Sequence, residues 1–277
     1  MGNDAGLVYR RCAPSPTLAP YVEHYWLVSA PAKQQPQSEI LIPNGRPMLL
    51  FSFGESSLRI DPLSGERVPN GNTISEITSQ PFVIEQLGES SYIGVQIQPY
   101  GLSALMPGKR IVNHLTPLDQ WLGEAQAAAL MSALTAHEFG LARIEIIDTY
   151  LQSKLMPLEP ELLETLKAAV EAIEKASGEL NIEALAQQHH MHYTTFYRLF
   201  KKHLGISPKQ FLEIVRYYKF VGELLHSVHR DPIAQIAALQ GYFDQAHAAK
   251  EFRQFTGVTP NTFRTTLNGI ATLMHQD

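Results

Sequence analysis

Residues 181–208 read NIEALAQQHHMHYTTFYRLFKKHLGISP and contain two short amphipathic patterns separated by a turn. Asn181 can cap the first helix, which has a buried stripe at positions 182, 185 and 186. After a turn at His190–His192, the second pattern places apolar side chains at 196, 199, 200 and 204. Its outer face is polar and basic, and a short helix with such a face fits a DNA major groove. The segment predicts a helix-turn-helix unit.

Longer helical patterns flank this unit. A helix predicted over about 161–176 ends at Ser177-Gly178, and Ser207-Pro208 opens another that runs to about Leu225 or His226. The second of these helices holds roughly 19 residues and measures about 28 Å, against about 34 Å for one turn of B-DNA. Such a strut would hold two reading helices in successive major grooves on one side of a duplex.

The residues after the strut repeat the pattern of the first unit. Asp231-Pro232 is a cap followed by a first-turn proline, and an apolar stripe at 233, 236 and 237 comes next. Gly241 makes the turn. The second helix is predicted over about 244–256, with Phe252 and Phe255 facing inward, and it stops at residues 257–260, GVTP. The chain is therefore predicted to carry two helix-turn-helix units joined by one helix.

Residues of about 161–265 resemble the DNA-binding domain of the AraC/XylS family of bacterial transcription regulators. The matching sequence segments include RLFKK at 198–202, LGISP at 204–208, IA at 236–237, GY at 241–242 and FTGVTP at 255–260. The resemblance is specific because two units, a strut and a terminator occur in order. It implies binding to double-stranded promoter DNA and contact with RNA polymerase.

Candidate DNA-binding residues lie on the second helix of each unit. They are Thr194, Thr195, Tyr197, Arg198, Lys201 and Lys202 in the first unit, and Gln245, Ala246, His247, Lys250 and Arg253 in the second. The resemblance puts base contacts on positions 194, 197 and 198, and on 245, 246 and 250. The alternative for the basic residues is a solvated helix face, and Tyr197 either stacks on the DNA backbone or covers its helix.

Two positions depart from the family pattern. His192 stands where the first recognition helix opens with a small capping hydroxyl, and Ala248 stands where the second carries an aromatic side chain. Loss of a large core side chain weakens packing by a few kcal/mol unless neighbours fill the space. We therefore expect the first unit to contribute more DNA affinity than the second.

Charge is unevenly distributed along the chain. The net charge is −5, but residues 192–264 hold 10 Lys and Arg against 5 Asp and Glu, and residues 1–159 hold 10 against 15. An acidic front half followed by a basic stretch is consistent with a sensor joined to a modest phosphate-binding surface.

The front half is predicted to be rich in β-structure. Strands are expected at Tyr21–Val28, Pro47–Phe53 and Tyr92–Ile97, with turn-forming clusters between them, which indicates a barrel or sandwich. Leucines and isoleucines at helical spacing predict two helices within 118–156. With a boundary at residues 157–160, the predicted fold is α+β with two domains, 1–157 and 158–277.

The front half also resembles, more loosely, sensor domains of the same family through YW at 25–26, IPNG at 42–45 and IGVQIQP at 93–99. Its aromatic residues are expected to form a core in preference to a ligand site; they are Tyr21, Tyr25, Trp26, Phe51, Phe53, Phe82 and Tyr92. The helices within 118–156 either pack on the barrel or form a dimer seam, and the resemblance favours a homodimer.

Other classes of function find little support. We see no nucleophile elbow, phosphate-binding loop or paired-carboxylate motif, so an enzyme is not expected. The histidines lack zinc-site spacing, so neither metal nor cofactor is expected. One cysteine, no apolar run of about 18 residues and no signal peptide indicate the cytoplasm. The predicted function is a sequence-specific regulator controlled by a small molecule or partner; the alternative is a ligand-binding or protein-interaction module without DNA affinity.

Overall fold

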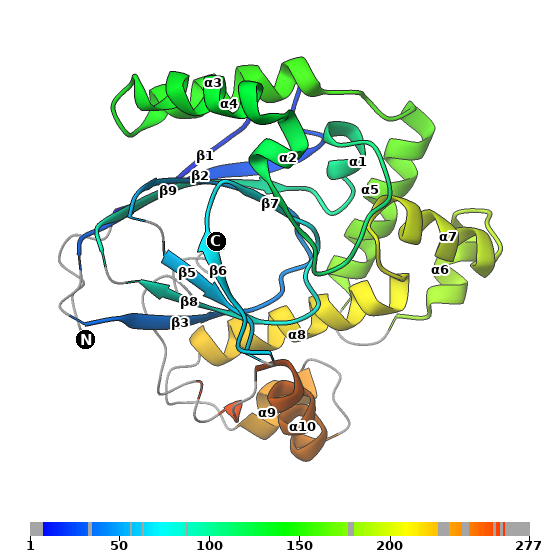
Figure 1. Ribbon diagram of the computed structural model, residues 1–277. Helices are drawn as coiled ribbons and strands as arrows, with labels where there is room; N and C mark the ends of the chain where they lie inside the picture. Colours follow the sequence, from blue (N-terminus) through cyan, green and yellow to red (C-terminus); the bar gives the residue numbers. More distant parts are fainter. Residues whose placement is uncertain are drawn as a thin grey trace.

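The computed structural model describes residues 8–32, 35–55, 57–62, 64–86, 88–176, 180–226, 233–239, 244–256, 259, 260 and 263. The front half contains two antiparallel sheets (Figure 1). The six-stranded sheet has the order β1 (Val8–Cys12), β2 (Val22–Ala30), β9 (Ser90–Ile97), β4 (Met48–Gly54), β7 (Thr73–Ser75) and β10 (Leu115–Pro117). The four-stranded sheet has the order β3 (Gln37–Leu41), β8 (Phe82–Gln86), β5 (Ser57–Ile60) and β6 (Arg67–Asn70). The three strands expected from the sequence correspond to β2, β4 and β9.

Side chains of β2 alternate between two buried clusters, as a strand covered on both faces requires. Tyr25 belongs to the core under the helices, whereas Trp26 packs with Leu50 and Tyr92. The Tyr92 hydroxyl lies 2.8 Å from both the backbone nitrogen and the side-chain oxygen of Ser57 on β5, and it thereby ties the two sheets together. The expectation of an aromatic core holds for these residues.

Helices cover the outer face of the six-stranded sheet (Figure 1). They are α1 (Leu102–Leu105), α2 (Leu118–Leu122), α3 (Glu124–Thr135) and α4 (Leu141–Lys154). Three helices thus occupy 118–154 where the sequence predicted two. Gly123, with φ of +84°, interrupts the first predicted helix near its start and separates α2 from α3. The leucines and isoleucines of these helices belong to the core between the helices and the sheet, except Leu141, which is 50% exposed. The leucine spacing is therefore explained by packing on the barrel, and the homodimer stays a prediction.

A buried polar contact joins α4 to the sheet. Asp148 accepts hydrogen bonds from the Tyr25 hydroxyl and the Ser15 backbone nitrogen, both at 2.9 Å. Burial raises the pKa of Asp148, but these bonds and one from Gln152 outweigh it, so the pKa lies below its usual value. The carboxylate therefore stays ionised and fixes α4 against β2.

The back half is helical, as expected. It contains α5 (Pro160–Lys175), α6 (Ile182–Gln188), α7 (Tyr193–His203), α8 (Pro208–His226), α9 (Ile233–Leu239) and α10 (Gln245–Thr256). The predicted stops and turns at Ser177-Gly178, Asp231-Pro232 and Gly241, and the first two residues of the terminator at 257–260, lie outside the described residues. No helix in the described part of the chain has the length and apolar composition needed to cross a membrane.

The two halves share packing at two places. Ile77 and Tyr100 of the front half belong to the same buried cluster as α5, α6, α7 and the first half of α8. Ile40 and Ile42 pack against the cluster of the second half of α8 with α9 and α10. Between these places, Arg46 forms ion pairs with Glu23 at 2.8 Å and with Glu174 of α5 at 2.5 Å. The barrel therefore contacts both helix-turn-helix units.

Candidate nucleic-acid interface

Helix α7 is amphipathic, and its inner face is aromatic. Phe196 and Phe200 are fully buried with ring centroids 4.9 Å apart, and Phe200 lies 6.3 Å from Phe211 of α8. Burying an aromatic side chain stabilises a fold strongly, so these rings determine which face of α7 points outward. The outward residues are those that the sequence nominated: Thr194, Thr195, Tyr197, Arg198 and Lys202 are exposed.

Lys201 is the exception among the six candidates of the first unit. It is half-buried, and its Nζ donates to the Gly205 carbonyl at 3.4 Å, one turn beyond its own position. A cation at a helix C-terminus stabilises the unpaired carbonyls of the last turn. The structure thus gives Lys201 a capping contact, and Arg198 and Lys202 remain as the exposed cations of α7.

The angle between α6 and α7 is set by small and capping residues. Asn181 caps α6 as predicted, accepting from the Ala184 backbone nitrogen at 3.0 Å. Ala186 is fully buried where the helices cross, and its carbonyl accepts from the Met191 backbone nitrogen at 3.0 Å. His190 takes a left-handed conformation, with φ of +55°, which turns the chain between the helices. These contacts present the outer face of α7 as a rigid surface.

The C-terminal end of α7 is held against the front half. The Ser103 hydroxyl donates to the His203 carbonyl at 3.2 Å and lies 3.2 Å from the His203 Nδ1. Gly205 follows with φ of +80°, and a Cβ there would lie 2.9 Å from the Cβ of Arg110. Burial, helped by the charges of Lys202 and Arg110, lowers the pKa of His203 and favours its neutral form. The sequence did not predict this joint, by which we mean the contacts of Ser103 and Arg110 with His203 and Gly205.

A buried ion pair supports the same joint from the barrel side. Arg110 and Glu76 are 5% and 3% exposed, and Nη1 lies 3.4 Å from Oε1. Arg110 Nη2 also donates to the Met106 carbonyl at 2.6 Å. Burial raises the pKa of Glu76, although the charge of Arg110 opposes this, and burial lowers the pKa of Arg110. Each charge therefore depends on the other to remain ionised in the interior.

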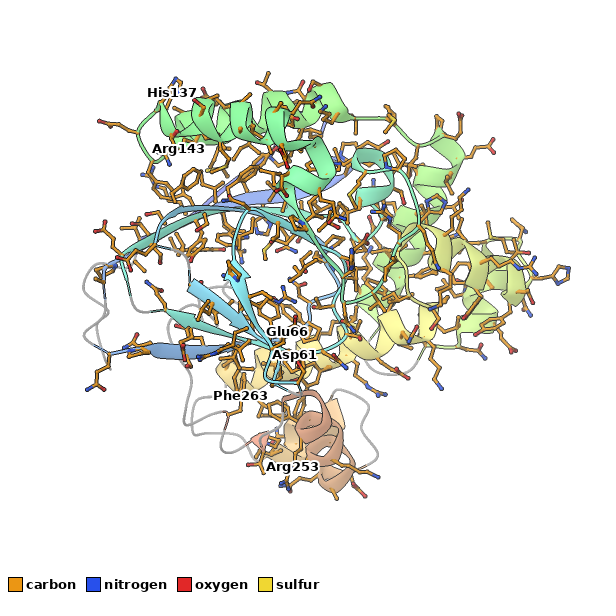
Figure 2. The ribbon with its side chains drawn as sticks, in the orientation of Figure 1. Asp61, Glu66, His137, Arg143, Arg253 and Phe263 are labelled. Carbon is orange, nitrogen blue, oxygen red and sulfur yellow. The ribbon has the colours of Figure 1, made fainter. Side chains whose placement is uncertain are left out.

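Helix α10 presents the second set of candidates. Gln245, Ala246, Lys250 and Arg253 are exposed, and Figure 2 shows Arg253 on the side of α10 away from the barrel. The side chain of His247 lies outside the described residues. The inner face is held by Phe252, whose ring centroid lies 5.3–5.9 Å from three other aromatic rings, those of Tyr217, Phe220 and Phe263.

Helix α8 is the predicted strut, and it belongs to both units. Phe211, Ile214 and Val215 from its first half are buried with α5, α6 and α7. Phe220, Val221 and Leu224 from its second half are buried with α9 and α10. Figure 1 shows α8 passing along the barrel with α6 and α7 near one end and α9 and α10 near the other. The two recognition helices are therefore attached to one continuous helix.

Comparison with known proteins agrees with this architecture. A family described as a helix-turn-helix domain (HTH_18) matches residues 185–266, and a domain of unknown function (DUF6597) matches residues 10–116. An uncharacterized HTH-type transcriptional regulator of Haemophilus influenzae is 30% identical over 113 residues, 41% of this chain and 37% of that protein. The arabinose operon regulatory protein of Escherichia coli is 27% identical over 142 residues, 51% of this chain and 46% of that protein.

The probable transcriptional regulator LumQ of Photobacterium leiognathi is 26% identical over 235 residues, covering 77% of this chain and 84% of that protein. Together with the helix-turn-helix family match over residues 185–266, these relatives support a regulator of the AraC/XylS type. Its matches span about a third of the length of the first curated relatives, 37% and 30%. A crystal structure of ToxT from Vibrio cholerae superimposes with a TM-score of 0.46 and 11% identity over 85% of this chain and 99% of that one.

The two departures from the AraC/XylS pattern have different structural outcomes. His192 occupies the N-cap position of α7, and its side chain makes no capping hydrogen bond, so that end of the helix lacks the usual cap. Ala248 is fully buried in the cluster around Phe252. Tyr217, Phe220, Phe252 and Phe263 belong to the same cluster, which favours the interpretation that neighbours fill the space.

Ala248→Phe should therefore destabilise the chain. A larger side chain at a filled position forces its neighbours apart and costs about 1–3 kcal/mol. Urea unfolding of the full chain measures the effect, and Ala246→Phe, at an exposed position of the same helix, is the matched control. Equal or greater stability of Ala248→Phe would show that the site is empty and that the second unit is underpacked.

Proposed function

We propose that the chain is a sequence-specific DNA-binding transcription regulator that reads two successive major grooves. One observation carries the proposal: two recognition helices with exposed polar faces are attached to a single helix of 19 residues. At 1.5 Å per residue α8 is about 28 Å long, close to one turn of B-DNA at about 34 Å. Both helices can then enter one side of the duplex.

The exposed side chains divide by chemistry into two roles. Arg198 and Gln245 carry forked donor and acceptor groups that suit guanine and adenine edges, so we assign them to base contacts. Thr194, Tyr197 and Ala246 complete the base-reading surface. Lys202, Lys250 and Arg253 are assigned to phosphates, whose contacts position a protein without reading sequence. Thr195 and His247 stand beside these residues as further contacts, whereas Lys201 acts through the end of α7.

The front half supplies the control in this proposal. It packs on both units, so a small molecule or protein bound there can favour one packing of the front half against the helical half. We infer that the protein acts on promoters in the bacterial cytoplasm, with RNA polymerase as a partner. A homodimer is also proposed, but the interface would not be the leucine stripe of α3 and α4, which is buried against the barrel.

The test is binding of the purified full chain to fragments of its own genome, measured by gel shift from low to physiological salt. The proposal expects preferred fragments over random DNA and an affinity that falls steeply as salt rises, because contacts to phosphates release counterions. Binding without any preference among fragments would reject sequence-specific regulation. Complete absence of binding at low salt would instead support the alternative, a ligand-binding or protein-interaction module.

A further inference from the structure

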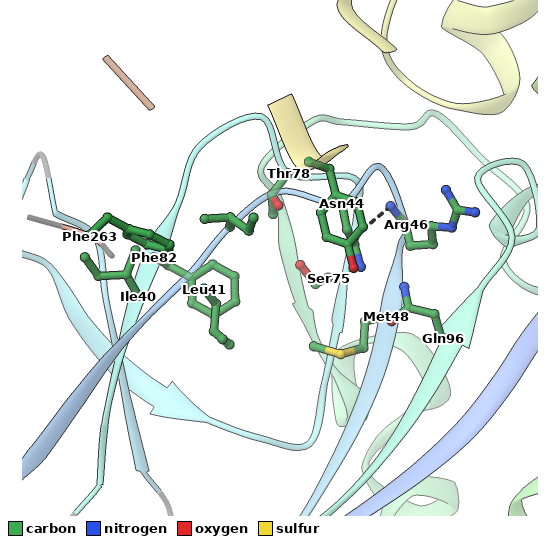
Figure 3. A pocket seen from close by; sticks show the side chains of 12 residues that line it. Ile40, Leu41, Asn44, Arg46, Met48, Ser75, Thr78, Phe82, Gln96 and Phe263 are labelled. Carbon is green, nitrogen blue, oxygen red and sulfur yellow. Dashed lines mark hydrogen bonds between the residues drawn. The ribbon is translucent and has the colours of Figure 1, made fainter. Parts of the chain in front are cut away.

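Two exposed aromatic side chains are neighbours on α7. Among the Phe, Tyr and Trp side chains that the structure describes, only Tyr193 and Tyr197 are exposed, at 41% and 36%. The others are buried or half-buried; Phe82 and Phe263, for example, line the small pocket in Figure 3. Single exposed apolar side chains are common, whereas adjoining ones mark a surface that contacts a partner. The pair on α7 therefore calls for a partner outside the chain.

The core of the first unit does not need these two rings. Phe196 and Phe200 fill the inner face of α7, and both are fully buried. Tyr193 and Tyr197 are four positions apart, which places them one turn apart on the same side of the helix. Their ring centroids lie 6.2 Å from each other, and the ring planes are inclined by 45°. The two tyrosines thus form one continuous aromatic surface beside the outer face of α7.

This aromatic surface lies at the end of α7 that would enter the groove. Tyr193 is the first residue of the helix. Helical side chains point back toward the N-terminus, so the Tyr193 ring extends toward that end. In a helix-turn-helix unit, the N-terminal residues of the recognition helix are the ones that contact base edges. Tyr193 therefore continues the surface that Tyr197 and Arg198 begin, although its residue type alone did not mark it as a candidate.

The chemistry of the major groove offers one partner for an aromatic surface. The base edges present hydrogen-bond donors and acceptors, and their one apolar group is the 5-methyl of thymine. Cytosine lacks this methyl group and presents an amino donor, which an aromatic ring leaves without a proper acceptor. A ring placed against such an edge favours thymine, because covering the methyl group removes apolar surface from water. Contacts to the phosphates would give no such preference.

We propose that Tyr193 is a specificity-determining residue of the first unit, and that its ring, held beside that of Tyr197, covers the 5-methyl group of a thymine. This inference rests on the proposed function and deepens it. It states that the half-site read by α7 contains a thymine whose methyl group contributes to affinity. Arg198 then reads a polar edge in the same half-site, while Tyr193 reads an apolar one.

The test removes the methyl group from the DNA and the ring from the protein. In the preferred fragment, each thymine is replaced in turn by deoxyuridine, which deletes only the methyl group, and binding of the full chain is measured by gel shift at fixed salt. At one thymine or more, the unchanged chain should bind about fourfold more weakly. Tyr193→Ala should bind the normal fragment more weakly by a similar factor and lose its response to deoxyuridine at that thymine. Such a cycle isolates the contact between the ring and the methyl group.

Two further variants separate this contact from a general effect. Tyr193→Phe keeps the ring and should keep the response to deoxyuridine, and Lys175→Ala on α5 should keep it as well. Alanine is the best helix former, so Tyr193→Ala should leave α7 intact, which urea unfolding of the same variant checks.

The outcomes distinguish this inference from the proposed function. If no thymine shows a methyl effect that Tyr193→Ala abolishes, Tyr193 does not read a thymine, and the inference is overturned while sequence-specific binding stands. An equal loss for Tyr193→Ala on preferred and random DNA overturns it too, because the ring would then contact only the backbone. Absence of any preferred fragment would reject the proposed function, and this inference with it.

Discussion

Arg198→Ala is expected to weaken binding to the preferred DNA fragment by about 1–3 kcal/mol, roughly 5- to 150-fold, with little change in stability. Arg198 is exposed on α7, while Phe196 and Phe200 hold the opposite face in the core. Removal of the guanidinium should therefore delete the proposed base contact without disturbing packing. Gel shifts at fixed salt, with the preferred fragment and with random DNA, measure the loss and the specificity ratio.

Lys175→Ala is the control for this experiment, because Lys175 is a highly exposed cation on α5, which is not a recognition helix. Lys250→Ala is expected to cost less than Arg198→Ala and to act alike on preferred and random DNA, since a phosphate contact carries no sequence information. If Arg198→Ala leaves the specificity ratio unchanged, α7 does not read bases through this residue. The alternative interpretation, in which the basic residues form a solvated helix face, would then hold for the first unit.

Arg110→Met is expected to destabilise the chain by about 3–5 kcal/mol at neutral pH. It removes the partner of Glu76 and leaves an unpaired carboxylate in a site that is 3% exposed. Adding Glu76→Gln to Arg110→Met should recover most of the loss, because the double variant leaves no buried charge. Lys109→Met, at the exposed neighbouring position, should be close to neutral.

The loss should also depend on pH in a defined direction. Burial already raises the pKa of Glu76 in the folded chain, and removal of the Arg110 charge raises it further. A carboxyl group with a raised folded-state pKa contributes stability below its unfolded pKa of about 4.3, and this contribution is lost as pH rises through the folded value. Urea unfolding of Arg110→Met should thus show a smaller deficit near pH 5 than near pH 8, and a deficit that is the same at both would contradict a buried unpaired carboxylate.

The helical half was predictable because its helices carry the information for their own bounds. The apolar spacing of Phe196, Phe200 and Leu204 and the cap at Asn181 are local, and α6, α7 and α8 begin and end within about a residue of expectation. The front half was predicted in class but not in detail. Its third helix within 118–154 depends on one glycine, Gly123, whose left-handed conformation no periodicity reveals.

The contact between the end of α7 and the front half could not be predicted from the sequence for a different reason. Ser103 and His203 are 100 positions apart, and their contact exists only after both halves have folded and packed. The packing of the Trp26 indole on Gly94 likewise requires a particular register between β2 and β9, and a strand pattern does not specify which residues face each other across a sheet. The contact of Lys201 with the Gly205 carbonyl could not be predicted from its charge, and its assignment to DNA stays a prediction.

Helix α8 has a consequence for the promoter as well as for the protein. Because its two halves are embedded in different hydrophobic cores, the molecule has no hinge between its recognition helices along residues 208–226. Under the proposed function, the separation of the two half-sites is then fixed at about one helical repeat, 10–10.5 base pairs. Such a protein would distinguish promoters by the phase of two short sequences on the duplex as much as by the bases themselves.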